Sequence, residues 1–118
     1  MRAQPATYAS PQIRTKSDAV APAAFGLGDL VLEIPAQHDE WWTIRELDWS
    51  TDRKPWPVGF IEVRDTTDDE VLWMQFFTDA GGQHRSFEPG LLVVPPNHGL
   101  RVTVCGDDCT KTLGVIYQ

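Results

Sequence analysis

The segment Glu40–Ser50 has the sequence EWWTIRELDWS, and its residue types predict an extended strand. Tryptophan, threonine and isoleucine are enriched in strands because their bulky side chains fit a pleated surface. The apolar residues of this segment do not recur at the spacing of three or four that an amphipathic helix requires. We therefore expect a β-strand over these residues.

The alternation of this strand is interrupted once. Trp42 and Ile44 share one face of an extended chain, but Leu47 and Trp49 fall on the opposite face, because successive side chains alternate. A β-bulge, one extra residue near Arg45-Glu46, would return all four apolar side chains to the core. A strand buried on both faces is the alternative.

Seven further strand-like runs flank this segment, and turn signals separate them. The spacing of the turns is about 8–12 residues, as is typical of β-sandwiches, and nine glycines and nine prolines provide the turn residues. No run shows convincing helical spacing. The runs are Asp29–Ile34, Val58–Arg64, Glu70–Thr78, Gln83–Phe87, Leu91–Val94, Leu100–Cys105 and Cys109–Tyr117.

These runs predict an all-β fold, an eight-stranded antiparallel β-sandwich of jelly-roll or Greek-key type over residues 28–118. The chain has 118 residues, which suits one domain. Its net charge of −7 argues against nucleic acid as a partner. It contains no apolar run of the roughly 18 residues that a membrane span needs, and Met1–Ser10 lacks the apolar stretch of a secretion signal.

The first segment, residues 1–27, differs in composition from the rest of the chain. Its local charge is +2, it contains three prolines, and neither strand nor helix periodicity is present. It is interpreted as an extended N-terminal arm, either a disordered tail or an arm that orders on a neighbouring subunit. The candidate docking residues of this arm are Arg2, Tyr8, Ile13, Arg14, Lys16 and Phe25.

The run from Val71 to Phe77 is apolar on both faces of the strand. Val71, Trp73 and Phe77 would share one face, and the even-numbered residues the other. One face would join the core, and the second needs another cover, either a loop of the same chain or a second subunit. The candidate subunit interface is Leu72, Trp73, Met74, Phe76 and Phe77.

No catalytic residue, metal site or cofactor is expected from the motifs. His38, His84 and His98 lack the spacing of a metal site. The aspartate-rich turns lack the ligand spacing of a calcium loop. A hydrolase whose residues carry no recognisable motif stays an alternative.

The two cysteines, Cys105 and Cys109, flank the short turn Gly106-Asp107-Asp108. If they lay opposite each other on the two strands of a hairpin, their Cβ atoms could be near disulfide distance. A bridge, a free pair of thiols and a redox or metal role are the three alternatives.

Five tryptophans are present, and Trp41 and Trp56 are the two that the pattern leaves outside the core. Exposed aromatic rings can stack on sugars, so these two residues form a possible ligand platform. A carbohydrate- or receptor-binding β-sandwich module is therefore the alternative function.

Four short motifs occur in a characteristic order: Trp42-x-Ile44, Leu47-x-Trp49-Ser50-Thr51-Asp52, Pro57-x-Gly59-x-Ile61-x-Val63 and Gly114-Val115-Ile116-Tyr117. This order resembles small β-sandwich virion proteins of tailed bacteriophages that decorate or cement the capsid or form head fibres. The resemblance covers roughly residues 40–65 and 99–118 and carries over no catalytic residue.

The resemblance implies a non-enzymatic capsid decoration or cement protein that bridges neighbouring subunits of the head. Its partners would be the major capsid protein or other virion proteins, together with copies of itself, with a trimer expected. It would be made in the host cytoplasm and located on the capsid surface.

Overall fold

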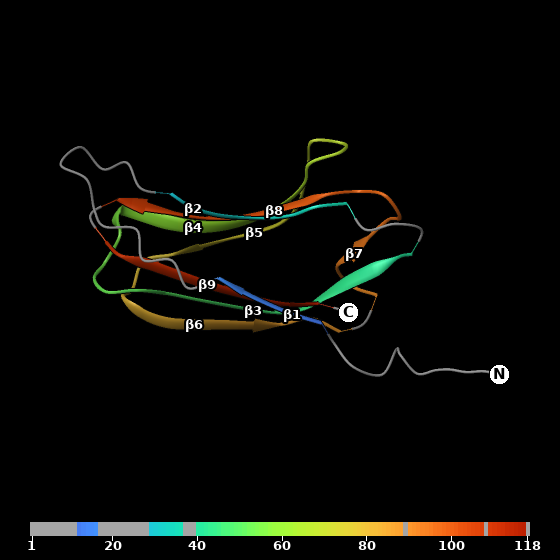
Figure 1. Ribbon diagram of the computed structural model, residues 1–118. Helices are drawn as coiled ribbons and strands as arrows, with labels where there is room; N and C mark the ends of the chain where they lie inside the picture. Colours follow the sequence, from blue (N-terminus) through green and yellow to red (C-terminus); the bar gives the residue numbers. More distant parts are fainter. Residues whose placement is uncertain (1–11, 17–28, 37–39, 89, 108, 118) are drawn as a thin grey trace.

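The computed structural model describes residues 12–16, 29–36, 40–88, 90–107 and 109–117. Over these ranges the chain forms nine strands and no helix, and the strands make two antiparallel sheets that lie one above the other (Figure 1). The prediction of an all-β fold with two facing sheets is confirmed. The same ranges contain no apolar helix of membrane-spanning length.

The two sheets interleave strands from distant parts of the sequence. One sheet has the order β1-β9-β3-β6, with the short β7 also paired to β3, and the other has the order β2-β8-β4-β5. Strands β2 to β9 overlap the eight predicted runs. The strand bounds are β1 Gln12–Lys16, β2 Leu30–Ile34, β3 Trp42–Thr51, β4 Trp56–Asp65, β5 Glu70–Phe77, β6 Gly81–Ser86, β7 Val93–Val94, β8 Leu100–Asp107 and β9 Lys111–Tyr117.

Strand β1 lies in the segment that the sequence assigns to the arm. It pairs antiparallel with β9, from Gln12 opposite Tyr117 to Lys16 opposite Leu113. Residues 12–16, which include Ile13, Arg14 and Lys16, therefore belong to the sheet of their own chain rather than to a free arm. The other candidate docking residues, Arg2, Tyr8 and Phe25, lie outside the described residues, so docking of the segment on a neighbour stays a prediction.

The β-bulge predicted in β3 is confirmed. The pairing of β3 with β9 shifts register between Ile44 and Glu46, and Trp42, Ile44, Leu47 and Trp49 are all buried. Two hydrogen bonds hold the bulge against the end of β6: the backbone N–H of Phe87 donates to the carbonyl of Arg45 (2.8 Å), and Arg45 Nε donates to the carbonyl of Phe87 (3.2 Å). The extra residue lets one long strand bury apolar side chains along its whole length.

The core between the sheets is centred on aromatic rings. Trp49 of β3 packs on Trp73 and Phe77 of β5, with ring centroids 6.4 and 6.1 Å apart, and Trp73 packs on Phe87 at 5.2 Å. Gly59 lies opposite Phe77, and a Cβ there would come within 2.6 Å of the phenylalanine ring, so the absence of a side chain admits that ring to the core. Each aromatic contributes roughly 1.5–3 kcal/mol through burial.

Replacing Trp49 by alanine should lower the free energy of unfolding by about 3–5 kcal/mol, because it removes the ring that contacts both aromatic residues of β5. Denaturant titration followed by circular dichroism measures this change. Trp41→Ala is the matched control, since Trp41 is 66% exposed, and it should change stability by no more than about 0.5 kcal/mol. Equal losses in the two variants would contradict the assignment of Trp49 to the centre of the core.

Candidate functional site

The most distinctive surface of the molecule is an apolar patch on the outer face of β4 and β5. We define the β4–β5 patch as Phe60, Val71, Met74 and Phe76. The rings of Phe60 and Phe76 lie directly across the two strands, with centroids 5.9 Å apart. Phe76 is 60% exposed and Met74 is 40% exposed, so these side chains present apolar surface to water.

A second bulge decides which residues of β5 reach this patch. The pairing of β4 with β5 changes register after Val63, so that Trp73 lies opposite Val63 while Val71 lies opposite Arg64. Leu72 is the extra residue. The expectation that Val71 shares a face with Trp73 is therefore wrong, because the bulge turns Val71 to the outer face.

The structure divides the five residues of the predicted interface between two environments. Met74 and Phe76 are exposed on the β4–β5 patch. Phe77 is 7% exposed and Trp73 packs against the aromatic core, so both stabilise the chain's own sandwich. Leu72 is partly buried against the same core. Of the five residues, Met74 and Phe76 are therefore the ones available for contact with another molecule.

Strand β5 is also the last strand of its sheet. It pairs with β4 on one side, and over the described residues no backbone hydrogen bond satisfies its other side. Exposed edge strands usually carry charges or prolines that prevent pairing with another chain, but the sequence of β5, EVLWMQFF, has only Glu70. A long apolar edge of this kind favours contact with a second protein.

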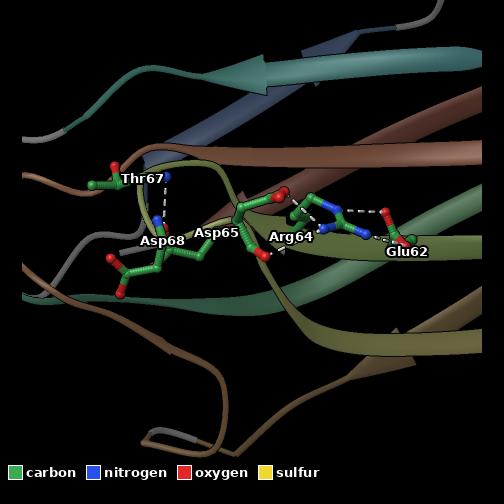
Figure 2. Close-up of polar contacts among 6 residues, drawn as sticks. Glu62, Arg64, Asp65, Thr67 and Asp68 are labelled. Carbon is green, nitrogen blue, oxygen red and sulfur yellow. Dashed lines mark hydrogen bonds and ion pairs between the residues drawn. The ribbon is translucent and has the colours of Figure 1, made fainter.

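Charged side chains beside the patch are paired with each other. Arg64 donates two hydrogen bonds to the carboxylate of Glu62, at 3.2 and 3.3 Å (Figure 2). It also donates one to the carboxylate of Asp69 at 2.9 Å. The positive charge of Arg64 is therefore paired within the chain. The β4–β5 patch lies beside these charged side chains and is apolar.

Two groups of acidic residues and histidine lie elsewhere on the surface. One consists of Asp65, Asp68 and His98, and the other of Glu46, Asp48 and His84. Neither group is visible in the spacing of residues along the chain. Each is assembled when a distant histidine is brought to a strand or turn that carries the acids.

In the first group, Asp65 joins two loops. Its Oδ1 accepts the backbone N–H groups of Thr67 and Asp68 at 2.9 and 3.0 Å (Figure 2), and its Oδ2 lies 2.6 Å from Nδ1 of His98. Because Asp65 is only 2% exposed and both oxygens are engaged, it has little capacity to bind a metal ion. We call this contact of the β4–β5 turn with the loop before β8 the Asp65–His98 clasp.

The clasp shifts the ionisation of both partners. Burial tends to raise the pKa of Asp65, but the hydrogen bonds from His98 and from the amides of Asp68 and Thr67 outweigh it, and the pKa lies below its usual value. The hydrogen bond to Asp65 raises the pKa of His98. The charged forms of both side chains are therefore favoured in the folded protein.

The two cysteines do not face each other across a hairpin. Strand β8, with Cys105, belongs to one sheet and the segment after it, with Cys109, leads into the other sheet. Neither cysteine forms a disulfide bond, and the thiol of Cys109 donates to the carbonyl of Gly106 at 3.5 Å. Burial raises the pKa of Cys105 to about 12, so this thiol is protonated at neutral pH and is a poor nucleophile.

The two tryptophans of the possible ligand platform are both exposed, but they are not neighbours. Trp41 directly precedes β3, and Trp56 follows the other end of that ten-residue strand. A strand of this length spans about 30 Å. The two rings therefore cannot form one shared platform.

In comparisons with known proteins, no family model and no curated protein match the sequence.

The clasp should make stability depend on pH in a defined way. The contribution of His98, whose pKa is raised by folding, is complete below about pH 6.5 and is lost as the pH rises through its folded pKa. That of Asp65, whose pKa is lowered, is present above about pH 4 and is lost as the pH falls through its folded pKa. The clasp stabilises the fold most between these values.

We therefore expect the stability difference between wild type and His98→Gln to be largest near pH 5 and to shrink towards pH 8. Urea unfolding at several pH values measures it. Glu88→Gln, a change of an exposed carboxyl outside the clasp, should keep the wild-type pH profile. A wild-type advantage that grows from pH 6 to pH 8 would show that the clasp does not act as described.

Proposed function

We propose that this chain is a non-enzymatic virion structural protein of the capsid decoration or cement type, and that it acts as a homo-oligomer. The observation that carries the proposal is the β4–β5 patch, an exposed apolar surface that includes β5, whose outer side pairs with no other strand among the described residues. Such a surface is costly to leave in water and is suited to permanent contact with other proteins.

The order of the strands supports a jelly roll as the finer description of the fold. In a jelly roll, eight strands are wound so that within each sheet strands from the first half of the chain alternate with strands from the second half. The orders β1-β9-β3-β6 and β2-β8-β4-β5 follow this scheme when β7 is treated as an addition to β3. Jelly rolls occur in viral capsid proteins and also in lectins and cupins, so the fold agrees with the proposal without deciding it.

A cement protein works by multivalent contact. An oligomer that binds several capsid subunits at once dissociates only when all of its contacts open together, so modest individual contacts give a stable particle. In this proposal Met74 and Phe76 bury their exposed surface between copies of the chain. The N-terminal segment, including Arg2, Tyr8 and Phe25, reaches the major capsid protein or another virion protein.

Binding of a carbohydrate or receptor is the second candidate function. The exposure of Trp41 and Trp56 favours it, because a single ring can stack on one sugar. A glycan array, repeated with Trp41→Ala and Trp56→Ala, tests this candidate. Specific sugar binding that is lost in either variant would support it over the structural function.

Met74→Asp and Phe76→Asp should each dissociate the oligomer. Each change places a charge where an apolar side chain contributes roughly 1.5–3 kcal/mol by burial, so association should weaken at least about tenfold. Size-exclusion chromatography with light scattering over a range of concentrations measures the change. Leu91→Asp is the control, since Leu91 is 68% exposed but lies outside the patch. A monomeric wild type that the two variants do not alter would contradict the oligomer.

The attachment to a virion is tested separately. In a density gradient of a lysate that contains the assembled particles, the chain should migrate with the heads, and quantitative mass spectrometry should find it in many copies per particle. Recovery of all the protein at the top of the gradient would exclude the virion assignment, whatever its oligomeric state.

A further inference from the structure

The second polar group, Glu46, Asp48 and His84, lies on the outer face of the sheet opposite to the β4–β5 patch. Its members come from neighbouring strands, the two acids from β3 and the histidine from β6. One ligand atom of each residue lies within 4.8 Å of those of the other two. Unlike Asp65 of the clasp, all three side chains are accessible to solvent.

The sheet register fixes this arrangement. Phe87 donates to the carbonyl of Arg45, so that pair is hydrogen-bonded across the two strands. Hydrogen-bonded and non-hydrogen-bonded pairs alternate along an antiparallel ladder, and Asp48 and His84, three positions further along, form a non-hydrogen-bonded pair. Side chains of such pairs are the closest ones in a sheet.

The contacts of His84 determine which ring nitrogen can bind an ion. Its Nδ1 lies 2.5 Å from Oδ1 of Asp48, and because a carboxylate can only accept, Nδ1 carries the proton. When the ring is neutral, its lone pair is therefore on Nε2. This nitrogen lies 3.6 Å from Oε1 of Glu46 and 2.9 Å from the hydroxyl oxygen of Ser86.

A carboxylate that holds the protonated nitrogen of a histidine is the usual partner of a metal-binding imidazole, because it fixes the tautomer and the orientation of the ring. The separation of Nε2 from the Glu46 oxygen also fits an ion between them, since two ligand atoms at about 2.0–2.2 Å from zinc lie up to roughly 4 Å apart. Nitrogen and carboxylate ligands together favour zinc and similar ions over calcium.

A surface hollow adjoins the group. It has a volume of about 500 Å³, and a Cβ on Gly82, one of its lining residues, would meet no atom within 4 Å. Water or a small ligand could therefore reach an ion held at its side. The hollow is lined in part by Asp48, Ser50, Gly82, His84, Thr112 and Gly114.

From these contacts the geometry points to a surface site for a divalent transition-metal ion, in which His84 Nε2 and Glu46 Oε1 bind the ion and Asp48 holds the imidazole in place. The remaining coordination positions are filled by water. The site lies on the sheet that the β4–β5 patch does not use, so it is independent of the proposed oligomer.

A hydrolytic triad is the alternative interpretation of this part of the surface. Hydrogen-bond contacts connect Ser86, His84 and Asp48 in the order of a nucleophile, a base and an acid. The side chains of His84 and Asp48 are 51% and 55% exposed. Catalysis by such a triad depends on stabilising charge where water is excluded, which this open position does not provide. Binding of an ion is the chemistry that tolerates this exposure.

Isothermal titration calorimetry of the full chain with zinc chloride at neutral pH tests the site. The wild type should bind one zinc ion per chain. His84→Ala and Glu46→Gln should lose this binding, and Asp48→Asn should weaken it by about 10–100-fold, as expected of a residue that orients a ligand. His98→Ala is the control and should bind zinc as the wild type does.

Nitrogen-15 spectra of the imidazoles provide a readout that a merely structural role would not change. Zinc should shift the Nε2 resonance of His84 while Nδ1 stays protonated, and calcium should leave both unchanged. Melting curves without zinc show whether each variant is folded. Absence of zinc binding by the wild type, equal binding by folded His84→Ala, or equal competition by calcium would each overturn the site.

Discussion

The contact of Trp49 with the two inward rings of β5 is the interaction on which the arrangement of the molecule depends. It joins the sheets at their centre, and it fixes which face of β5 is turned to the core. Once Trp73 and Phe77 are committed to that face, Met74 and Phe76 must point away from it. The exposed patch is thus a direct result of the way the core is packed.

The two bulges have complementary effects on the strands that carry them. In β3 the extra residue brings four apolar side chains to one face and leaves Glu46 and Asp48 in positions where they approach His84. In β5 the extra residue turns Val71 outward and extends the apolar surface. One bulge therefore shapes the polar face of the sandwich and the other its apolar face.

The strands and the first bulge could be predicted because their signals are local. The period of two, the turn residues and the broken alternation of β3 each lie within about ten residues, and they predicted eight strands and the first bulge. Contacts that depend on strand register could not be predicted. The pairing of Asp48 with His84 and of Asp65 with His98 arises only when strands or loops more than thirty positions apart are aligned. The Asp-rich turn at Asp65 could have suggested a carboxylate that caps its own turn, but not its histidine partner.

The pairing of β1 with β9 bears on where the domain can be cut. A fragment that starts at residue 28, the boundary suggested by composition, would lack a strand of the fold and leave the backbone of β9 from Leu113 to Tyr117 without its neighbour on the side away from β3. In recombinant forms truncated at that point, β9 would become an exposed edge strand that can pair with another chain. Poor solubility of such a truncation would then reflect the missing strand rather than the behaviour of the intact protein.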